Sequence, residues 1–448
     1  MRRTLQTALV ALLILTLGIV GAWANGAQEG QEEGAAAAAN PTDNPWTNGE
    51  DLSGTTVNIF GAFVEPGSDY FREAMDYFEE ETGITVNYTG SGDFESLISV
   101  RVEGGDPPDI AAFPQPGVLQ DFVSRGHVVD LHDHISEEEL LEQYDRSWLE
   151  IATMDGIMAG VWYRANVKSL VWYPVPEFSE NGYEVPETWD EMMALTEQMA
   201  EDGNVPWSIG IESSGATGWV ATDWLEDIML RTATPEKYDQ WVAGELPFDS
   251  PEVQRAMEIM GEIWKNQEYV RGGVNSILTV PFGDAPNPLF NDPPRAYLHR
   301  QASFITDFFP EDAVVGEDVD FFYLPPIDEE EGNPVLGAGD IFAAFEDRPE
   351  VAAVMRYLTT GRSIKPWVES GGVVAPHKDA ELSWYPTEAN RRYAEILQNA
   401  DTFRFDASDM MPGQVGAGAF WSEMVNWVNG KPIDETLQAI DNSWPEEE

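Results

Sequence analysis

The sequence predicts an α/β fold made of two bodies, each a mainly parallel sheet flanked by helices. Short apolar strand patterns alternate with amphipathic helix patterns, as expected for parallel sheets that are covered on both faces. The chain has 448 residues, which is too long for a single core to be the default. Between residues 167 and 191, a buried strand pattern leads into three prolines and a new helix start. This segment predicts a crossing from one body to the other.

The first residues predict export. Arg2 and Arg3 give a positive region, residues 9–20 are apolar, and Ala22-Trp23-Ala24 is a small-x-small cleavage site, so residues 1–24 are expected to be a cleavable signal peptide. A retained membrane anchor is the alternative, but the apolar run is short for a spanning helix. Residues 25–48 have almost nothing to bury and are expected to form a disordered tether.

The first body opens with a regular alternation of strand and helix patterns. Strands are expected at 57–59, 84–88 and 109–113, and helices at 71–78 and 94–102, with Asp93 capping the second helix. Ligands of open parallel sheets bind beyond the carboxyl ends of the strands. The loops at 63–65, 91–93 and 114–116 are therefore candidate ligand-binding loops.

The crossing segment has a strand and a helix with a stiff connection between them. Residues 169–173 are apolar, β-branched and aromatic, as in a buried strand, and prolines at 174, 176 and 186 surround an Asn181-Gly182 turn. Thr188 and Glu191 form a capping box for a helix that continues through Met199. An ordinary loop within one domain is the alternative.

The remaining patterns complete two discontinuous bodies. Further strands are expected at 207–212, 296–305 and 321–324, helices at 219–231, 251–264 and 349–360, and a loop at 282–294. Crossings are expected near Tyr173, Pro325 and Ala375. The predicted N-terminal lobe is 49–172 plus 326–375, and the predicted C-terminal lobe is 173–325 plus 376–448.

Several segments resemble one protein family. The strand followed by Tyr-Pro and then Pro-x-Thr-Trp-Asp-Glu, the Gly-x-Pro-x-Asp-Ile pattern before the third strand, and the Gly-Ala-Gly-Ala-Phe-Trp run at 416–421 are similar to the family 1 extracellular solute-binding proteins, the maltose-binding-protein-like subunits of ABC sugar importers. The amino-acid sequence at 162–164, 167–170 and 299–303 is most similar to that of α-glucoside-binding members. The resemblance implies a type II periplasmic binding protein fold that closes on a sugar by a hinge, a membrane permease as partner, and an aromatic sugar platform at Trp421.

A neutral sugar needs polar partners for its hydroxyls and an aromatic ring for its C–H face. Strand-end loops and the resemblance together supply both kinds of side chain. The candidate hydroxyl partners are Glu65, Asp93, Gln115, Lys168, Glu212, Gln301 and Asp340, and the candidate stacking rings are Phe63, Trp219 and Trp421. Because 80 residues are Asp or Glu, many single carboxylates will be solvated surface.

Net charge limits the possible partners. A formal charge of −56 argues against nucleic acid and anionic membranes, which need a basic surface. Such an excess of acid also suits strong salt, where repulsion is screened, so we expect a saline environment. The chain has no cysteine and hence neither disulfides nor a lipid-anchored cysteine. We expect a monomer, periplasmic or extracellular.

Other function classes find less support. A secreted glycoside hydrolase remains the main alternative, since hydrolases also use paired carboxylates and aromatic platforms, and a structural surface protein is disfavoured because no repeat is visible. Motifs for hydrolase nucleophiles, P-loops, zinc proteases and dinucleotides are absent from the sequence. His127, His132 and His134 lack a third zinc ligand, and the acidic run at 311–320 lacks the spacing of a calcium loop. We therefore expect no enzyme activity, no cofactor and no metal.

Overall fold

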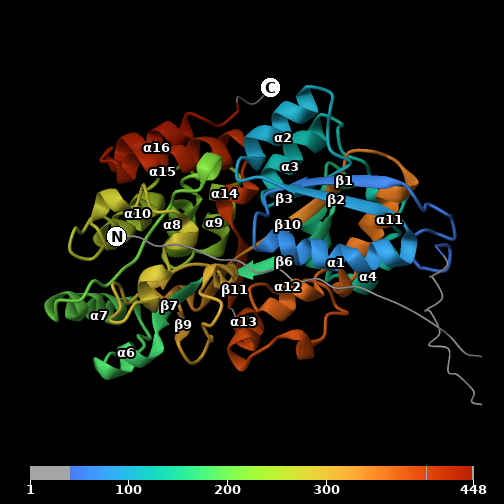
Figure 1. Ribbon diagram of the computed structural model, residues 1–448. Helices are drawn as coiled ribbons and strands as arrows, with labels where there is room; N and C mark the ends of the chain where they lie inside the picture. The colour runs from blue at the N-terminus through green and yellow to red at the C-terminus, as the bar shows by residue number, and fades with distance from the viewer. Residues whose placement is uncertain (1–40, 400, 446–448) are drawn as a thin grey trace, which may run out of the picture. The chain divides into compact units, whose positions relative to one another are not determined.

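The larger sheet is mixed and combines strands from the first half of the chain with two later strands, β10 and β11 (Figure 1). The computed structural model describes residues 41–399 and 401–445. The strand order is β11-β10-β3-β1-β2, with β6 also paired to β10. Strands β2, β1 and β3 are parallel, as predicted, whereas β10 runs antiparallel to β3 and β6. The strands are β1 Thr56–Gly61, β2 Thr85–Gly90, β3 Ile110–Phe113, β6 Val161–Val167, β10 Pro334–Ala344 and β11 Thr402–Phe405.

Helices with one apolar stripe cover this sheet and form the first core. Phe71, Met75 and Phe78 are buried on α1 at helical spacing, as the sequence predicted. The helices are α1 Gly67–Thr82, α2 Phe94–Glu103, α3 Pro116–Ser124, α4 Glu137–Gln143, α5 Arg146–Ala152, α11 Pro349–Leu358 and α12 Lys365–Ser370. Their buried side chains belong to a single apolar cluster, the first core.

The second sheet differs from the prediction of parallel strands. Its order is β8-β7-β9, and both pairings are antiparallel. The strands are β7 Leu170–Pro174, β8 His299–Arg300 and β9 Val319–Tyr323. The strand expected at 207–212 makes isolated parallel bridges instead, from Trp207 to Val270 and Leu298 and from Glu212 to Pro281. Turns on both sides keep these bridges from extending into a ladder.

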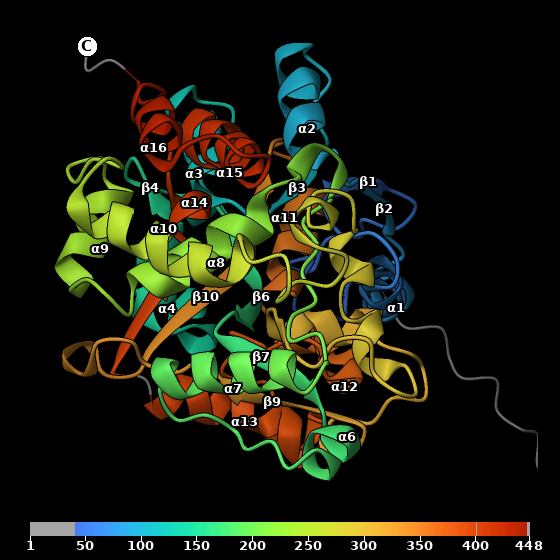
Figure 2. The same cartoon turned by 90° about the vertical axis from the view of Figure 1, so that its left-hand side faces the viewer.

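The two faces of the second sheet contact different apolar clusters, because side chains alternate along a strand. Val171 and Phe322 belong to the second core, whereas Trp172 and Phe321 belong to a third, smaller cluster. Figure 2 shows the strands between α7 (Trp189–Glu201) and α13 (Glu388–Asn399). The second sheet thus packs against the second core on one face and against the third cluster on the other.

The second core is mainly helical. The capping box of Thr188 and Glu191 is present at the start of α7, as predicted. Its other helices are α8 Trp219–Met229, α9 Pro235–Val242, α10 Pro251–Trp264, α14 Ala407–Met410, α15 Trp421–Val428 and α16 Ile433–Asp441, with a π-helical turn at Gln414–Phe420 before α15. These elements supply most of the second core.

The connection at the first crossing differs from the prediction because part of it is helical. The proline-rich connection contains a short helix, α6 Val175–Glu180, because Pro176 lies within its first turn, where a missing N–H costs nothing. The strand β6, which precedes the crossing, was not predicted. It carries two residues of the functional site.

Two chain segments pack in a way that does not match the predicted lobe boundaries. Trp46 is 7% exposed and contacts Phe78 and Tyr357, so the predicted tether ends before this residue. After the predicted third crossing near Ala375, Tyr385 and Phe405 still belong to the first core. The chain returns to the second core only at Ala407. We propose lobe boundaries near residues 41 and 406 in place of 49 and 376.

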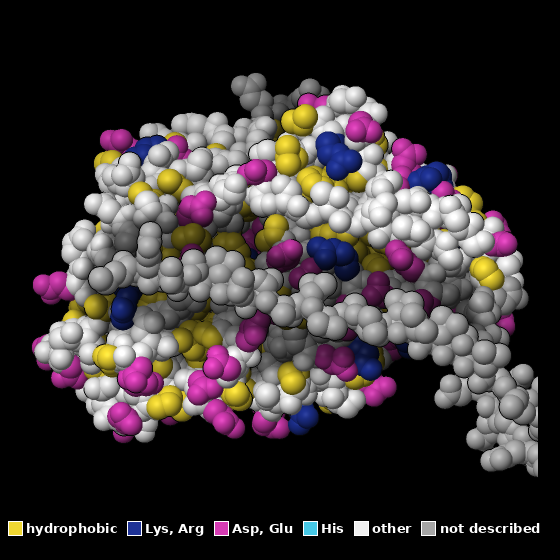
Figure 3. Space-filling model, in the orientation of Figure 1, with side chains coloured by type: hydrophobic (Ala, Val, Ile, Leu, Met, Phe, Trp, Pro, Cys, Tyr) yellow, Lys and Arg dark blue, Asp and Glu magenta, His cyan; other side chains and the backbone are white. Residues whose placement is uncertain are grey.

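The predicted signal peptide and the first part of the predicted tether lie outside the described residues. Among residues 41–399 and 401–445, no helix is long and apolar enough to cross a membrane. Figure 3 shows Asp and Glu side chains spread across the visible face, with few Lys and Arg among them, in keeping with the large negative charge.

Candidate functional site

A cavity of about 200 Å³ lies where the two cores approach each other. Its walls come from the connections after β1, β2 and β3, from β6 and β10, and from α8, α12 and the start of α15. The carboxyl ends of β1, β2 and β3 thus contribute to it, as expected for an open parallel sheet.

Six of the ten candidate residues line this cavity: Phe63, Gln115, Lys168, Trp219, Asp340 and Trp421. The other four, Glu65, Asp93, Glu212 and Gln301, do not line it. Glu65 is exposed, and Gln301 is fully buried with its Oε1 accepting from the backbone N–H of Ala302.

Asp93 and Glu212 both bind the turn at Ser214. Asp93 stands at the N-cap position of α2 but makes no side-chain cap bond. Its Oδ1 accepts hydrogen bonds from Ser214 Oγ at 2.8 Å and from the N–H of Gly215 at 3.0 Å. Glu212 Oε1 accepts from the N–H of Ser214 at 2.9 Å. The expected cap is therefore wrong, because the carboxylate bonds across to a distant loop.

Arg164, which sequence reasoning missed, dominates one wall. Its guanidinium carbon lies 4.5 Å from the Phe63 ring centre and 4.4 Å from that of Trp367, and its Nε donates to Asp340. Burial raises the pKa of Asp340, while Arg164 opposes that shift. The two rings meet edge to face with their centres 5.0 Å apart, and the guanidinium packs against both of them. These contacts and the ion pair hold its plane and direct its remaining N–H groups.

The same wall holds three buried oxygens with no hydrogen-bond partner among the described residues: Gln115 Oε1, Asn166 Oδ1 and Asp340 Oδ1. They come from the loop after β3, from β6 and from β10. Buried acceptors are rarely left unpaired. A ligand with hydrogen-bond donors would satisfy these oxygens once their side chains turn toward it.

Lys168 lies at the second-core side of the cavity and is 5% exposed. Its Nζ donates to Asp223 Oδ1 at 2.8 Å and to Asp406, and it lies 4.0 Å from Asp409. Although burial lowers it, these carboxylates raise the pKa of Lys168 well above its ordinary value. The ammonium group is thus already engaged by carboxylates of the protein, and its predicted role as a partner of a sugar hydroxyl stays a prediction.

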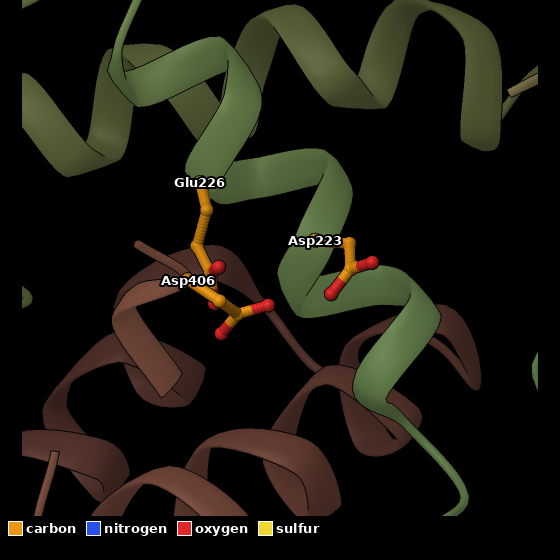
Figure 4. Close-up of side chains that lie close together, drawn as sticks. All are labelled: Asp223, Glu226 and Asp406. Atoms are coloured by element: carbon orange, nitrogen blue, oxygen red, sulfur yellow. The ribbon is translucent and has the colours of Figure 1, made fainter. Parts of the chain in front are cut away.

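Asp223, Glu226 and Asp406 point toward one another (Figure 4), with ligand atoms all within 4.8 Å. Burial raises the pKa of Asp223 to about 8 and that of Glu226 well above its usual value, while Lys168 holds the pKa of Asp406 low against the effect of burial. Glu226 accepts from the N–H groups of Ala407 and Ser408. Lys168 supplies positive charge to this cluster through its ion pairs with Asp223 and Asp406.

Two further carboxyls in the cavity were not foreseen. Burial raises the pKa of Glu95 to about 7 and that of Asp307 to about 6. Asp307 accepts from Trp367 Nε1 at 2.7 Å and from Ser370 Oγ at 3.3 Å. The sequence offered no signal for them, since 80 acids are distributed along the chain.

Aromatic rings form the remaining walls. Trp219 is half-buried and lies 5.2 Å from Phe282 and 6.0 Å from Phe304 between ring centres. Trp421 lines the cavity and donates from Nε1 to Ser408 Oγ. Gly218 has a φ of 122°, and a Cβ there would collide with the Trp421 backbone, so only glycine lets α8 approach α15 this closely.

Comparison with known proteins identifies the family. Residues 64–360 match the family of bacterial extracellular solute-binding proteins. The chain belongs to this family. It is 48% identical to the osmoprotective compounds-binding protein GgtB of Synechocystis sp. over 90% of this chain and 95% of that one. It is 43% identical to the α-glucosides-binding periplasmic protein AglE of Rhizobium meliloti over 88% of each. The solute receptor AcbH, which prefers β-D-galactopyranose, is 18% identical over 87% of this chain and 98% of that one, with a TM-score of 0.76.

These findings confirm the resemblance inferred from the crossing segment and the two-lobed binding-protein fold. They also confirm a solute-binding protein of an ABC transporter and not an enzyme, which removes the hydrolase alternative.

Proposed function

We propose that this protein captures a neutral α-glucoside in the cavity and delivers it to the permease of an ABC importer. The observation that carries the proposal is the wall of three unpartnered acceptors, Gln115, Asn166 and Asp340, beside the stacked Arg164. A sugar hydroxyl donates one hydrogen bond and accepts others. Adjacent hydroxyls of one ring can therefore pair with this wall of acceptors and with the guanidinium.

Aromatic rings across the cavity support the same ligand class. Half-buried Trp219 offers a flat apolar surface for the C–H face of a sugar ring, and Trp421, although only 3% exposed, also lines the cavity. An anionic sugar is disfavoured, because Asp307 and Asp340 line the cavity and Lys168 is already neutralised by its carboxylates.

Relatives narrow the choice of glucoside. One relative is named for α-glucosides and another for osmoprotective compounds. We propose a non-reducing disaccharide, trehalose or sucrose, ahead of maltose. The net charge of −56 fits a cell that meets high salt and gains from such solutes.

We further propose an exported monomer. The predicted signal peptide and the family's extracellular setting support secretion to the periplasm or the cell exterior. The partners are then a small sugar and the permease subunits, with no nucleic acid.

Calorimetric titration tests the ligand class. We expect binding of trehalose or sucrose, weaker binding of maltose, and none of glucuronate or glucose 6-phosphate. Tight binding of an anionic sugar with no response to any of the three disaccharides would overturn the proposal. Chromatography of each mixture after incubation should show intact disaccharide.

A further inference from the structure

Two carboxylates hold one serine at the edge of the cavity. Asp93 Oδ1 accepts from Ser214 Oγ and from the N–H of Gly215, and Glu212 Oε1 accepts from the N–H of Ser214. We call Asp93, Glu212, Ser214 and Gly215 the clasp.

The clasp joins the two cores. Asp93 immediately precedes Phe94, which is buried in the first core, whereas Ser214 lies between Ile211 and Val220 of the second core. The direct neighbours of the clasp, Gly92 and Ser213 among them, line the cavity, but the clasp residues themselves do not. Any separation of the two bodies at this edge must break the bonds of Asp93.

Both partners of this contact have locally unfavourable structure. Asp93 leaves α2 without a side-chain cap, although aspartate is among the best N-cap residues. Ser214 has a φ of 52°, a left-handed conformation that is unfavourable for a residue with a Cβ. Both features are accounted for if the contact between the bodies is what stabilises this arrangement.

We propose that the clasp sets the affinity for every ligand by the same factor, because it stabilises the closed cavity without touching the sugar. This rests on the proposed function. The apparent dissociation constant of a protein that binds only when closed is the intrinsic constant divided by the closed fraction. Asp93 is thus a positioning residue that changes the closed fraction and leaves selectivity alone.

Substitution of Asp93 tests whether the clasp changes affinity without changing selectivity. Asp93→Ala should weaken trehalose and sucrose binding by the same factor, about five- to tenfold for a lost charge-assisted pair of hydrogen bonds, through faster dissociation. Asp93→Asn, which keeps an acceptor oxygen, should restore much of the affinity. Asp106→Ala is the matched control, because Asp106 is an exposed carboxylate after the other end of α2. A changed trehalose-to-sucrose ratio, or an unchanged affinity for both, would overturn the proposal.

A cross-link tests the clasp without a ligand. A Cβ built on Gly215 lies 3.8 Å from Asp93 Cβ, which is the mean Cβ spacing of a disulfide, and the chain has no other cysteine. Oxidised D93C/G215C should form the bridge and show a smaller radius of gyration by small-angle scattering than its reduced form. Failure to oxidise, or an equal radius in both forms, would overturn the clasp.

The same variant separates the clasp from the proposed function. Radiolabelled trehalose bound before oxidation should stay trapped until a thiol is added, and trehalose added after oxidation should not enter. Free exchange through an oxidised clasp would contradict gating at this edge. A wild-type protein that binds no disaccharide would instead contradict the proposed function, while the cross-link and scattering results would still decide the clasp.

Discussion

Arg164 and Lys168 are four residues apart, line one cavity and carry the same charge, yet the protein holds them differently. Arg164 packs against two aromatic rings and forms one ion pair, to Asp340. Lys168 bonds to Asp223 and Asp406 and is close to Asp409. The side chain of Arg164 is 15% exposed and that of Lys168 is 6% exposed.

This difference shows how two cations in one cavity can differ in their availability to a ligand. A compact ammonium group suits a buried site among carboxylates, and a planar guanidinium suits stacking with directed N–H groups. Lys168 is thus expected to support the structure and Arg164 to meet the ligand. Four changes can break or sharpen that comparison.

The largest effect is expected from Lys168→Met. Removal of the ammonium group leaves Asp406 buried without its cation and Asp223 with only Arg300 at 3.7 Å, which should destabilise the fold by about 3–5 kcal/mol. Urea denaturation measures this loss, and it should be smaller at pH 5, where the carboxyls can take up protons. Lys365→Met is the control, because Lys365 pairs only with Glu369 in the described chain and is 42% exposed. A loss equal to the control would show that the cluster does not depend on Lys168.

The next effect concerns pH. Burial raises the pKa of Asp223 to about 8, while an unfolded aspartate titrates near 4. The folded state therefore binds more protons than the unfolded state between about pH 4 and 8, so this group makes stability fall as pH rises across that window. The contribution of one proton is at most about 1.4 kcal/mol per pH unit. Asp223→Asn should flatten the dependence of the urea midpoint on pH, and an unchanged slope would contradict the assignment.

Arg164→Lys probes the other cation. The charge beside Asp340 is kept, so the unliganded melting temperature should change little. Lysine cannot direct a planar fork of N–H groups at the ligand, so trehalose affinity should fall about thirtyfold, in line with about 2 kcal/mol for a hydrogen bond to a charged group. Calorimetry and melting curves report the two quantities. Wild-type affinity in this variant would move ligand recognition away from Arg164.

Trp421→Ala is expected to have the smallest effect on affinity, roughly tenfold, from the loss of one stacking face. It tests whether the Lys168 side of the cavity also binds the sugar. Trp427 is the control on the same helix, since it is 2% exposed in the second core beneath Lys265. Trp427→Ala should cost about 3–5 kcal/mol of stability and leave trehalose affinity nearly unchanged. Normal affinity with early melting in Trp421→Ala would make Trp421 a core residue.

Local patterns predicted helix faces and helix starts in both cores. The spacing of Phe71, Met75 and Phe78 gave the buried face of α1, and the capping box gave the start of α7. The second sheet was harder, because 207–212 has the composition of a strand but finds a ladder partner at only two positions. Strand pairing depends on distant segments, and composition cannot report it.

The candidate site residues show the same limit of sequence-based prediction. Strand-end position correctly placed Gln115 and Phe63 at the cavity, while Asp93 and Glu212, chosen on the same argument, bond to Ser214. Arg164 and Trp367 were missed because neither follows a predicted parallel strand. Strand-end logic selects a region of the molecule and does not give the direction of a side chain.

By itself, the sequence determined the family, the α/β alternation, the helix faces and the acidic charge, since each follows from residues that are close along the chain or from composition. Only the tertiary structure decided which charges pair and which remain for a ligand. Lys168 meets Asp406 across 238 positions, and Arg164 meets Asp340 across 176. Coulomb energy and desolvation depend on distance and burial in space, so the roles of these two cations are fixed only once the chain has folded.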